Sequence, residues 1–261
     1  MNKLRSIYIC LLICTFFSLT AFGQHFDIKT IKSKTLDNSF VVFSNSDYPN
    51  AAQKINQYLQ LSELHLLEYG AKDNIFEIIA PNPEMTGNVG DMSADIIQNS
   101  EELLSLYFYA MPCGANCSVI YNYHNFNPKN GDVVKLEDLV QKDKHAEFIT
   151  TIKNKRLADL KATIQEAEKL EEMSLDHLEY LFDAYRSDET FDDFYIRDDS
   201  LFINGFMNLN RIDYTSPIDL LSSFGVEDLK PYLNEYGKIV FGLATGDVQK
   251  YRSSSISQLY R

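Results

Sequence analysis

The clearest pattern in the chain is a strict alternation of side chains over residues 100–127, on both sides of a Gly-containing centre. This alternation predicts a β-hairpin. If the loop is Gly114-Ala115-Asn116, Cys113 lies opposite Cys117, and residues equidistant from Ala115 face each other across the strands. Tyr109 is then the partner of Tyr121, and Tyr107 the partner of Tyr123.

Because side chains return to the same face at every second residue, the four tyrosines and the two cysteines share one face of the predicted hairpin. The opposite face carries Leu104, Leu106, Phe108 and Ala110 against Ile120, Asn122, His124 and Phe126. Two interpretations of the tyrosine-bearing face remain open. It is a recognition surface, since tyrosine offers a rigid amphipathic contact, or it packs under a helix predicted over residues 145–172.

The rest of the chain predicts short strands and amphipathic helices around this hairpin. Pro49 is suited to the first position of a helix because it has no N–H to leave unpaired. The expected strands cover 26–35, 38–46, 75–80, 194–207 (a hairpin with a turn at Asp198-Asp199-Ser200) and 238–243. Together these elements predict an α+β fold, an antiparallel sheet with a long central hairpin, covered by helices.

Boundaries along the chain follow from composition. Residues 81–91 are rich in Pro, Gly and Asn, which predicts a loop. This loop divides one domain, residues 24–246, into a strand-helix part (24–90) and a part with the hairpin and helices (91–246). Residues 247–261 have little periodicity and form a C-terminal tail. Its basic residues offer docking on an acidic surface, but we expect a mobile end.

Residues 1–23 have the three-part order of a secretory signal peptide. Lys3 and Arg5 precede an apolar run from Ile7 to Phe17, and Ala21-Phe22-Gly23 provides small residues before a cut at Gln24. The alternative is a permanent membrane anchor, but a spanning helix needs roughly 20 apolar residues, and Ser18 and Thr20 interrupt this run. We therefore expect an exported protein, periplasmic or secreted, with no membrane span after cleavage.

Charge narrows the range of partners. The formal net charge is −13, and removal of two basic residues with the signal peptide makes it −15. Nucleic acid and anionic lipid need a basic binding surface, so neither is expected as a partner. An envelope protein or a cell-wall glycan remains, and the sequence does not indicate an oligomeric state.

The cysteines left after cleavage are Cys113 and Cys117. An oxidising compartment permits a disulfide between them. A zinc site would need about four ligands, and no second pair of cysteines or histidines lies nearby in the sequence. We expect a disulfide, no metal site and no cofactor.

Catalytic motifs are missing from the sequence: there is no GxSxG, no HExxH, no phosphate loop and no GxGxxG. His124 lies on the apolar face of the hairpin, where a hydrogen-bonded core histidine is more common than a ligand or a base. The acidic residues between Asp188 and Asp199 could hold a hard cation, but their spacing matches no calcium loop. A solvated acidic edge is the preferred interpretation.

Three segments together resemble a known family. The first is the helix entry Tyr48-Pro49-Asn50-Ala51-Ala52 with Ile55-Asn56, and the last is FYIRDDSLFI at 194–203. The hairpin segment contributes Leu103-Leu104-Ser105, Phe108, Gly114-Ala115, Tyr123, Asn125-Phe126, Gly131, Val134, Leu136 and Asp138-Leu139. This arrangement resembles the extracellular domain of RsiV-type anti-sigma factors and the similar domain of unknown function attached to some polysaccharide deacetylases.

The resemblance implies an α+β fold, residence in the cell envelope and no catalytic centre in this domain. Two departures matter. Asn116 stands where family members often have histidine, and no transmembrane helix leads to a sigma-binding segment, so anti-sigma signalling is not expected.

The leading hypothesis is therefore an exported, non-catalytic binding module of the cell envelope that recognises a protein or cell-wall ligand. Its expected ligand-binding residues are Tyr107, Tyr109, Asn116, Tyr121 and Tyr123. The alternatives are a structural or assembly protein of the envelope without a discrete ligand and, third, a glycan-acting enzyme.

Overall fold

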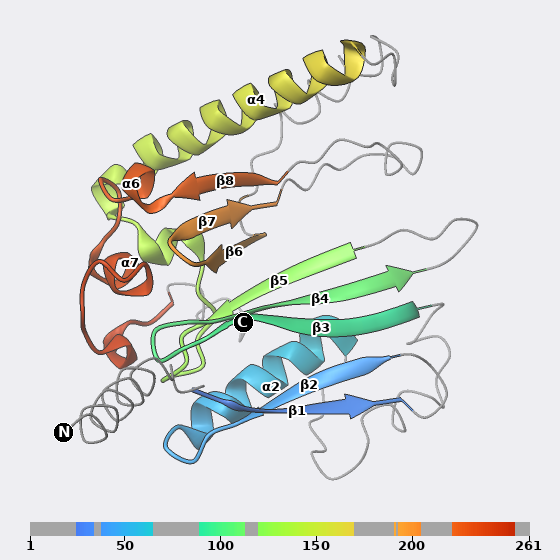
Figure 1. Cartoon of the computed structure of the whole chain (residues 1–261). Coiled ribbons are helices and arrows are strands. Elements are labelled where there is room, and N and C mark those ends of the chain that lie inside the picture. The colour runs from blue at the N-terminus through green and yellow to red at the C-terminus, as the bar shows by residue number, and fades with distance from the viewer. Residues whose placement is uncertain are drawn as a thin grey trace, which may run out of the picture.

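The computed structural model describes residues 25–33, 38–64, 89–112, 120–169, 191, 193–204 and 221–253. These residues form helices and three small antiparallel sheets, as expected for an α+β fold (Figure 1). Within the described part of the chain, none of the helices combines the length and apolar character needed to span a bilayer.

The N-terminal layer consists of β1 (Asp27–Lys32), β2 (Ser39–Ser44) and α2 (Pro49–Leu64). The two strands are antiparallel, and the helix begins at Pro49 as predicted. Asn56 fixes the helix to β2, because its buried side chain accepts a hydrogen bond from Phe43 N (2.9 Å) and donates one to Phe43 O (2.8 Å). Both polar groups of this amide are thereby satisfied inside the core.

The central sheet contains β3 (Val89–Asn99), β4 (Leu104–Pro112) and β5 (Ile120–Phe126) in the order β3-β4-β5. Residues 89–91 belong to β3, so the predicted loop over 81–91 is wrong at that end. Irregularities in the pairing of β3 with β4 between Val89 and Met92 and between Ile96 and Gln98 interrupt the alternation of its side chains. A bulged strand of this kind has no regular period of two in its sequence.

The C-terminal layer contains a third sheet, β6 (Phe194–Arg197), β7 (Ser200–Ile203) and β8 (Ser222–Gly225), and the long helix α4 (His145–Lys169). α4 packs beside β8, and its side chains Phe148 and Ile152 are buried. Short helical turns complete the layer: η1 (Leu136–Leu139), η2 (Lys142–Lys144), α6 (Val226–Leu229), α7 (Glu235–Val240) and η4 (Val248–Lys250).

The strand predicted over 238–243 is wrong. Residues 238–240 belong to α7, whose N-cap is Asn234. The Asn234 side chain accepts a hydrogen bond from Gly237 N (2.9 Å), which starts the helix. Gly242 follows the helix with a φ of +69°, in the left-handed conformation that commonly ends helices.

Two hydrophobic cores lie on either side of the central sheet. The first contains Leu104, Leu106 and Phe108 from one face of β4, packed with β1, β2 and α2. The second contains Leu103, which directly precedes the same strand, packed with β6–β8, α4 and α7. At its base the sheet is therefore covered on both faces, and Figure 1 shows β6 beside β5 and α2 on the other side.

Candidate functional site

The four tyrosines of the central hairpin form one surface, which we call the tyrosine face: Tyr107 and Tyr109 on β4, and Tyr121 and Tyr123 on β5. In the observed register Tyr107 pairs with Tyr123 and Tyr109 pairs with Tyr121. The cross-strand pairing predicted from the sequence is confirmed. Since directly paired residues share a face, all four rings project from the same side of the sheet.

The tyrosine face is in contact with solvent. Tyr121 is 44% exposed, and the other three rings are half-buried. The rings touch in a zigzag: the centroids of Tyr107 and Tyr121, of Tyr107 and Tyr123, and of Tyr109 and Tyr121 are each 5.7 Å apart. These distances lie within the range of favourable aromatic pairs, so the rings support one another in an ordered surface.

The aromatic row continues onto the third sheet. Tyr123 stacks on Tyr195 of β6 with ring centroids 4.8 Å apart, and Tyr195 stacks on Phe202 of β7 at 4.7 Å. The Arg197 guanidinium lies over Phe202, 5.3 Å from the ring centroid. Tyr195 and Phe202 are not among the ligand-binding residues predicted from the sequence. The hairpin predicted over 194–207 makes them cross-strand partners on one face, and this pairing was the available signal.

The alternative cover for these tyrosines, the helix predicted over 145–172, does not lie on them. α4 runs along β8, with β6 and β7 between it and β5 (Figure 1). Lys155 of this helix lies over the ring of Phe224 in β8, at 5.5 Å from the centroid. Among the described residues, the element that covers this face is β6, at the base of the hairpin.

Two carboxylates border the tyrosine face. Asp95 on β3 accepts a hydrogen bond from the Tyr107 hydroxyl at 2.8 Å. This bond to Asp95, followed by burial, raises the pKa of Tyr107 to about 12. Burial, followed by the charge of Tyr195, also raises the pKa of Tyr123. Both phenols stay protonated near neutral pH, so they can donate hydrogen bonds.

Asp193 is the second bordering carboxylate. It accepts hydrogen bonds from Asn204 Nδ2 (2.7 Å) and from Tyr123 N (3.4 Å). Burial is the largest influence and raises the pKa of Asp193, although both hydrogen bonds act against it. Asp193 therefore links β5 to the third sheet instead of projecting into solvent.

The remaining acidic residues of 188–199 do not converge where they are described. Asp198 and Asp199 are exposed in the turn between β6 and β7, and Asp198 has a φ of 52°. Positions 188, 189 and 192 lie outside the described residues. No group of three His, Cys, Asp or Glu side chains that could hold a metal ion occurs within the described ranges. Cys113, Asn116 and Cys117 also lie outside them, so the disulfide stays a prediction.

His124 is a hydrogen-bonded core histidine, as predicted. Its Nε2 lies 2.7 Å from Glu63 Oε1, and both side chains are buried. Asn122 donates to the other oxygen of Glu63 at 3.0 Å. Burial acts to raise the pKa of Glu63, but the hydrogen bond and charge of His124, together with hydrogen bonds from Asn122 and Ser62, hold that pKa below its ordinary value. Glu63 could not be predicted as the partner of His124 because the two residues lie 61 positions apart in the sequence.

The fold is similar to those of two solved structures of DUF3298 family proteins. One, from Bacteroides fragilis, has a TM-score of 0.50 and 13% sequence identity, and the match covers 85% of this chain and 97% of that one. The other, from Pseudomonas aeruginosa, has a TM-score of 0.50 and 10% identity, covering 82% and 98%. No family model and no curated protein sequence matches the chain. At such identities the likeness concerns the fold alone.

Proposed function

We propose that this chain is an exported, non-catalytic binding module of the cell envelope whose tyrosine face recognises a protein ligand. The observation that carries the proposal is the solvent-exposed ring of Tyr121 within a continuous aromatic row. Tyrosine is enriched at interaction hot spots because it combines a large apolar ring with a polar hydroxyl. The resemblance to RsiV-type extracellular domains supports the placement in the envelope and is part of this proposal.

A protein ligand is favoured over a glycan by the edge of β5. Tyr123 N points toward Asp193, and Asn125 O accepts a hydrogen bond from Val134 N, so odd-numbered residues of β5 direct their main-chain groups away from β4. By the same alternation, the N–H and C=O of Tyr121 point away from β4 at this edge. An extended segment of a partner can hydrogen-bond to such an edge while its side chains pack on neighbouring rings.

Two other functions fit the geometry less well. A structural protein without a discrete ligand would be expected to present a uniformly charged surface, and the aromatic row argues against it. A glycan-acting enzyme would need two acidic groups across a cleft. Of the described acidic residues in 188–199, Asp193 is occupied by Asn204 and Tyr123, and Asp198 and Asp199 are exposed on a turn.

The binding proposal is tested with purified mature protein, immobilised and incubated with envelope extract. Leu61→Ala is the matched control for Tyr121→Ala, because Leu61 is 42% exposed but lies on α2, away from the tyrosine face. We expect wild type and Leu61→Ala to retain the same protein, and Tyr121→Ala to retain at most a tenth as much. A tenfold loss corresponds to about 1.4 kcal/mol of binding free energy.

The same three proteins are then sedimented with purified cell-wall glycan. If the wild type sediments with the glycan and Tyr121→Ala does not, the ligand of the tyrosine face is a glycan and not a protein. Capture of protein that is identical for all three would contradict a role of the tyrosine face.

Export is tested separately. We expect the N-terminal residue of the protein isolated from its native host to be Gln24 and the mass of the unreduced protein to be lower by about 2 Da than after reduction, because Cys113 and Cys117 are oxidised. An intact N-terminus with free thiols would contradict the expected compartment.

A further inference from the structure

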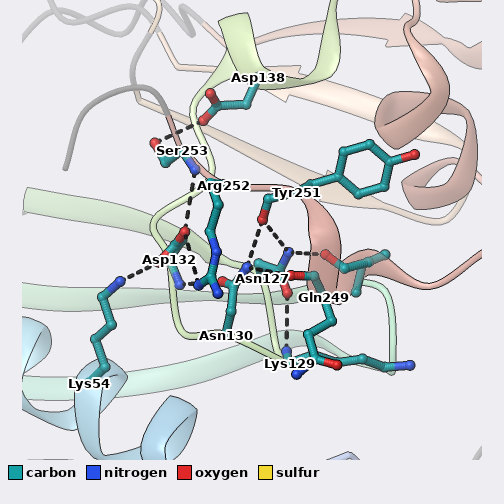
Figure 2. Close-up of polar contacts among 11 residues, drawn as sticks. Lys54, Asn127, Lys129, Asn130, Asp132, Asp138, Gln249, Tyr251, Arg252 and Ser253 are labelled. Carbon is teal, nitrogen blue, oxygen red and sulfur yellow. Dashed lines mark hydrogen bonds and ion pairs between the residues drawn. The ribbon is translucent and has the colours of Figure 1, made fainter. Parts of the chain in front are cut away.

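The C-terminal segment 247–253, which we call the strap, lies across the turn formed by residues 127–132 (Figure 2). The expectation of a mobile end is wrong for this segment. Val248 is buried in the second hydrophobic core. The Tyr251 ring stacks on Tyr236 of α7, with centroids 4.7 Å apart and planes 7° from parallel.

The turn holds the strap through its main chain. Asn127 is buried, and its Nδ2 donates to Val248 O (2.7 Å) and to Tyr251 O (3.3 Å). Asn130 Nδ2 donates to Tyr251 O at 2.6 Å and to Gln249 O at 3.4 Å. Two side-chain amides thus donate to the carbonyls of Val248, Gln249 and Tyr251, which lie in and directly after the helical turn η4.

The same turn positions these amides without help from the strap. Asn127 Oδ1 accepts from Lys129 N (3.1 Å), and Asn130 Oδ1 accepts from Asp132 N (2.9 Å). Gly131 has a φ of +71°, and a Cβ at this position would lie 2.7 Å from Ala51 O of α2. Both the backbone conformation and the close approach to α2 therefore require glycine here. Because these bonds lie within the turn, we expect the amide donors to keep their direction when the strap is absent.

Side-chain selectivity comes from Asp132 and Asp138. The buried Asp132 carboxylate pairs with Lys54 of α2, and it also faces Arg252 Nη1 at 3.9 Å and Ser253 N at 3.4 Å. Ser253 Oγ donates to Asp138 Oδ2 at 3.1 Å. Lys54 partly balances the buried negative charge of Asp132. The Arg252 guanidinium and the Ser253 N–H of the strap are further partners of this carboxylate.

We infer that the turn 127–132, together with Tyr236 and Asp138, is a peptide-binding site for a segment of the type Val-x-x-Tyr-Arg-Ser that begins with a helical turn, and that the strap occupies this site in cis. The hydrogen bonds join residues more than 100 positions apart and involve Val248, Tyr251 and Ser253 of the strap. The same segment supplied by a second copy of this chain would meet identical contacts. In cis it has the advantage of a high effective concentration.

The experiment uses the full mature chain, folded first and then cleaved. A protease recognition sequence is inserted between Ala244 and Thr245, which are exposed and precede the strap. After cleavage, the nicked protein is mixed with an excess of a fluorescent peptide of residues 247–253, and binding is followed by anisotropy. The uncut protein is the occupied-site control.

We expect saturable binding to the nicked protein and at least tenfold weaker binding to the uncut protein, because the covalent strap competes. A Tyr251→Ala peptide should bind at least tenfold more weakly than the natural peptide, since it loses the stack on Tyr236. A Gln249→Ala peptide is the matched control and should bind like the natural one, because the exposed Gln249 contributes only its main chain.

Three results would overturn the inference. One is equal binding of the natural, Tyr251→Ala and scrambled peptides. Another is no exchange at all by a nicked protein that keeps its circular dichroism spectrum. The third is unfolding of the chain on cleavage, which would make the strap part of the core and not a ligand.

Discussion

The two faces of the β4–β5 hairpin differ sharply although they alternate along the same strands. Leu106 and Phe108 are fully buried against α2 and the β1–β2 pair. Tyr107 and Tyr109, their immediate neighbours, are half-buried, and Tyr121 opposite Tyr109 is 44% exposed. Toward the base of the hairpin the difference disappears, since Leu103 and Ser105 are also buried.

We propose that one face of the hairpin contributes to stability and the other to recognition. Removing apolar area from water stabilises the folded state, so the Phe108 face contributes to folding wherever it is covered. Within the described ranges, the tyrosine face is covered at its base, where the Asn125 side chain donates to Phe194 O (2.7 Å) and β6 crosses. In its distal half, large aromatic rings stay in contact with water, which is unfavourable for apolar surface. Exposed apolar patches of this kind are typical of interaction sites.

The largest expected effect is on the buried face. Phe108→Ala should lower the free energy of unfolding by about 3–5 kcal/mol, because it leaves a cavity in the first core. Tyr109→Ala, one residue away on the other face, should cost about 1 kcal/mol, a typical value for a point substitution. Urea denaturation of the two variants checks this. Equal losses would show that both faces are parts of the core.

The second largest effect is expected at the buried pair of His124 and Glu63, at the edge of the first core. Glu63→Gln should lower the free energy of unfolding by about 1–3 kcal/mol at neutral pH, because His124 loses a charged hydrogen-bond partner. The pKa of Glu63 is held below its ordinary value in the folded state. Its contribution is therefore fully present above the ordinary glutamate pKa and is lost as the pH falls through the folded pKa.

Denaturation of wild type and Glu63→Gln between pH 7 and pH 3 measures this change. We expect the difference between the two proteins to shrink as the solution becomes acidic. A difference that stays constant over this range would mean that the ionisation of Glu63 contributes nothing to stability.

The third effect concerns the tip of the hairpin. Cys113→Ser should lower the free energy of unfolding by about 1–2 kcal/mol, because a disulfide that closes a short loop restricts the unfolded chain only modestly. It should also make the tip more sensitive to protease. An unchanged melting temperature together with unchanged cleavage would count against a disulfide at this position.

The smallest effect is electrostatic. Asp95→Asn should lower the pKa of Tyr107 from about 12 toward that of a free tyrosine, because the hydrogen bond to a carboxylate is the main cause of the shift. Because the pKa of Tyr107 is raised in the folded state, its protonated hydroxyl contributes to stability below the ordinary tyrosine pKa. This contribution to stability is lost as the pH rises through about 12. An NMR titration of labelled tyrosine rings measures it, and an unchanged Tyr107 pKa would exclude the bond.

The hairpin register could be predicted from the sequence because one face of each strand is buried, and a slip by one residue would exchange the two faces. β3 was not predicted because its bulges disrupt the alternation. The apolar run at 238–243 suggested a strand, since short apolar runs do not distinguish a strand from a buried helix. Asn234 favours the helix because its side chain caps the N-terminus of α7.

Contacts between distant segments explain what the sequence could not predict about the sites. Glu63 beside His124, Tyr195 beside Tyr123 and the strap beside Asp132 each depend on how separate elements pack. No local pattern in the chain carries that information. The extent of the aromatic row depends on how the third sheet packs next to β5.

The most direct test of the central claim is site-specific photo-crosslinking in the native host. A photoreactive phenylalanine analogue replaces either Tyr121 or Leu61, which are exposed to nearly the same degree on different faces. We predict a discrete cross-linked protein product from position 121 and none of that mass from position 61. The same product from both positions, or none from position 121, would contradict a recognition role for the tyrosine face.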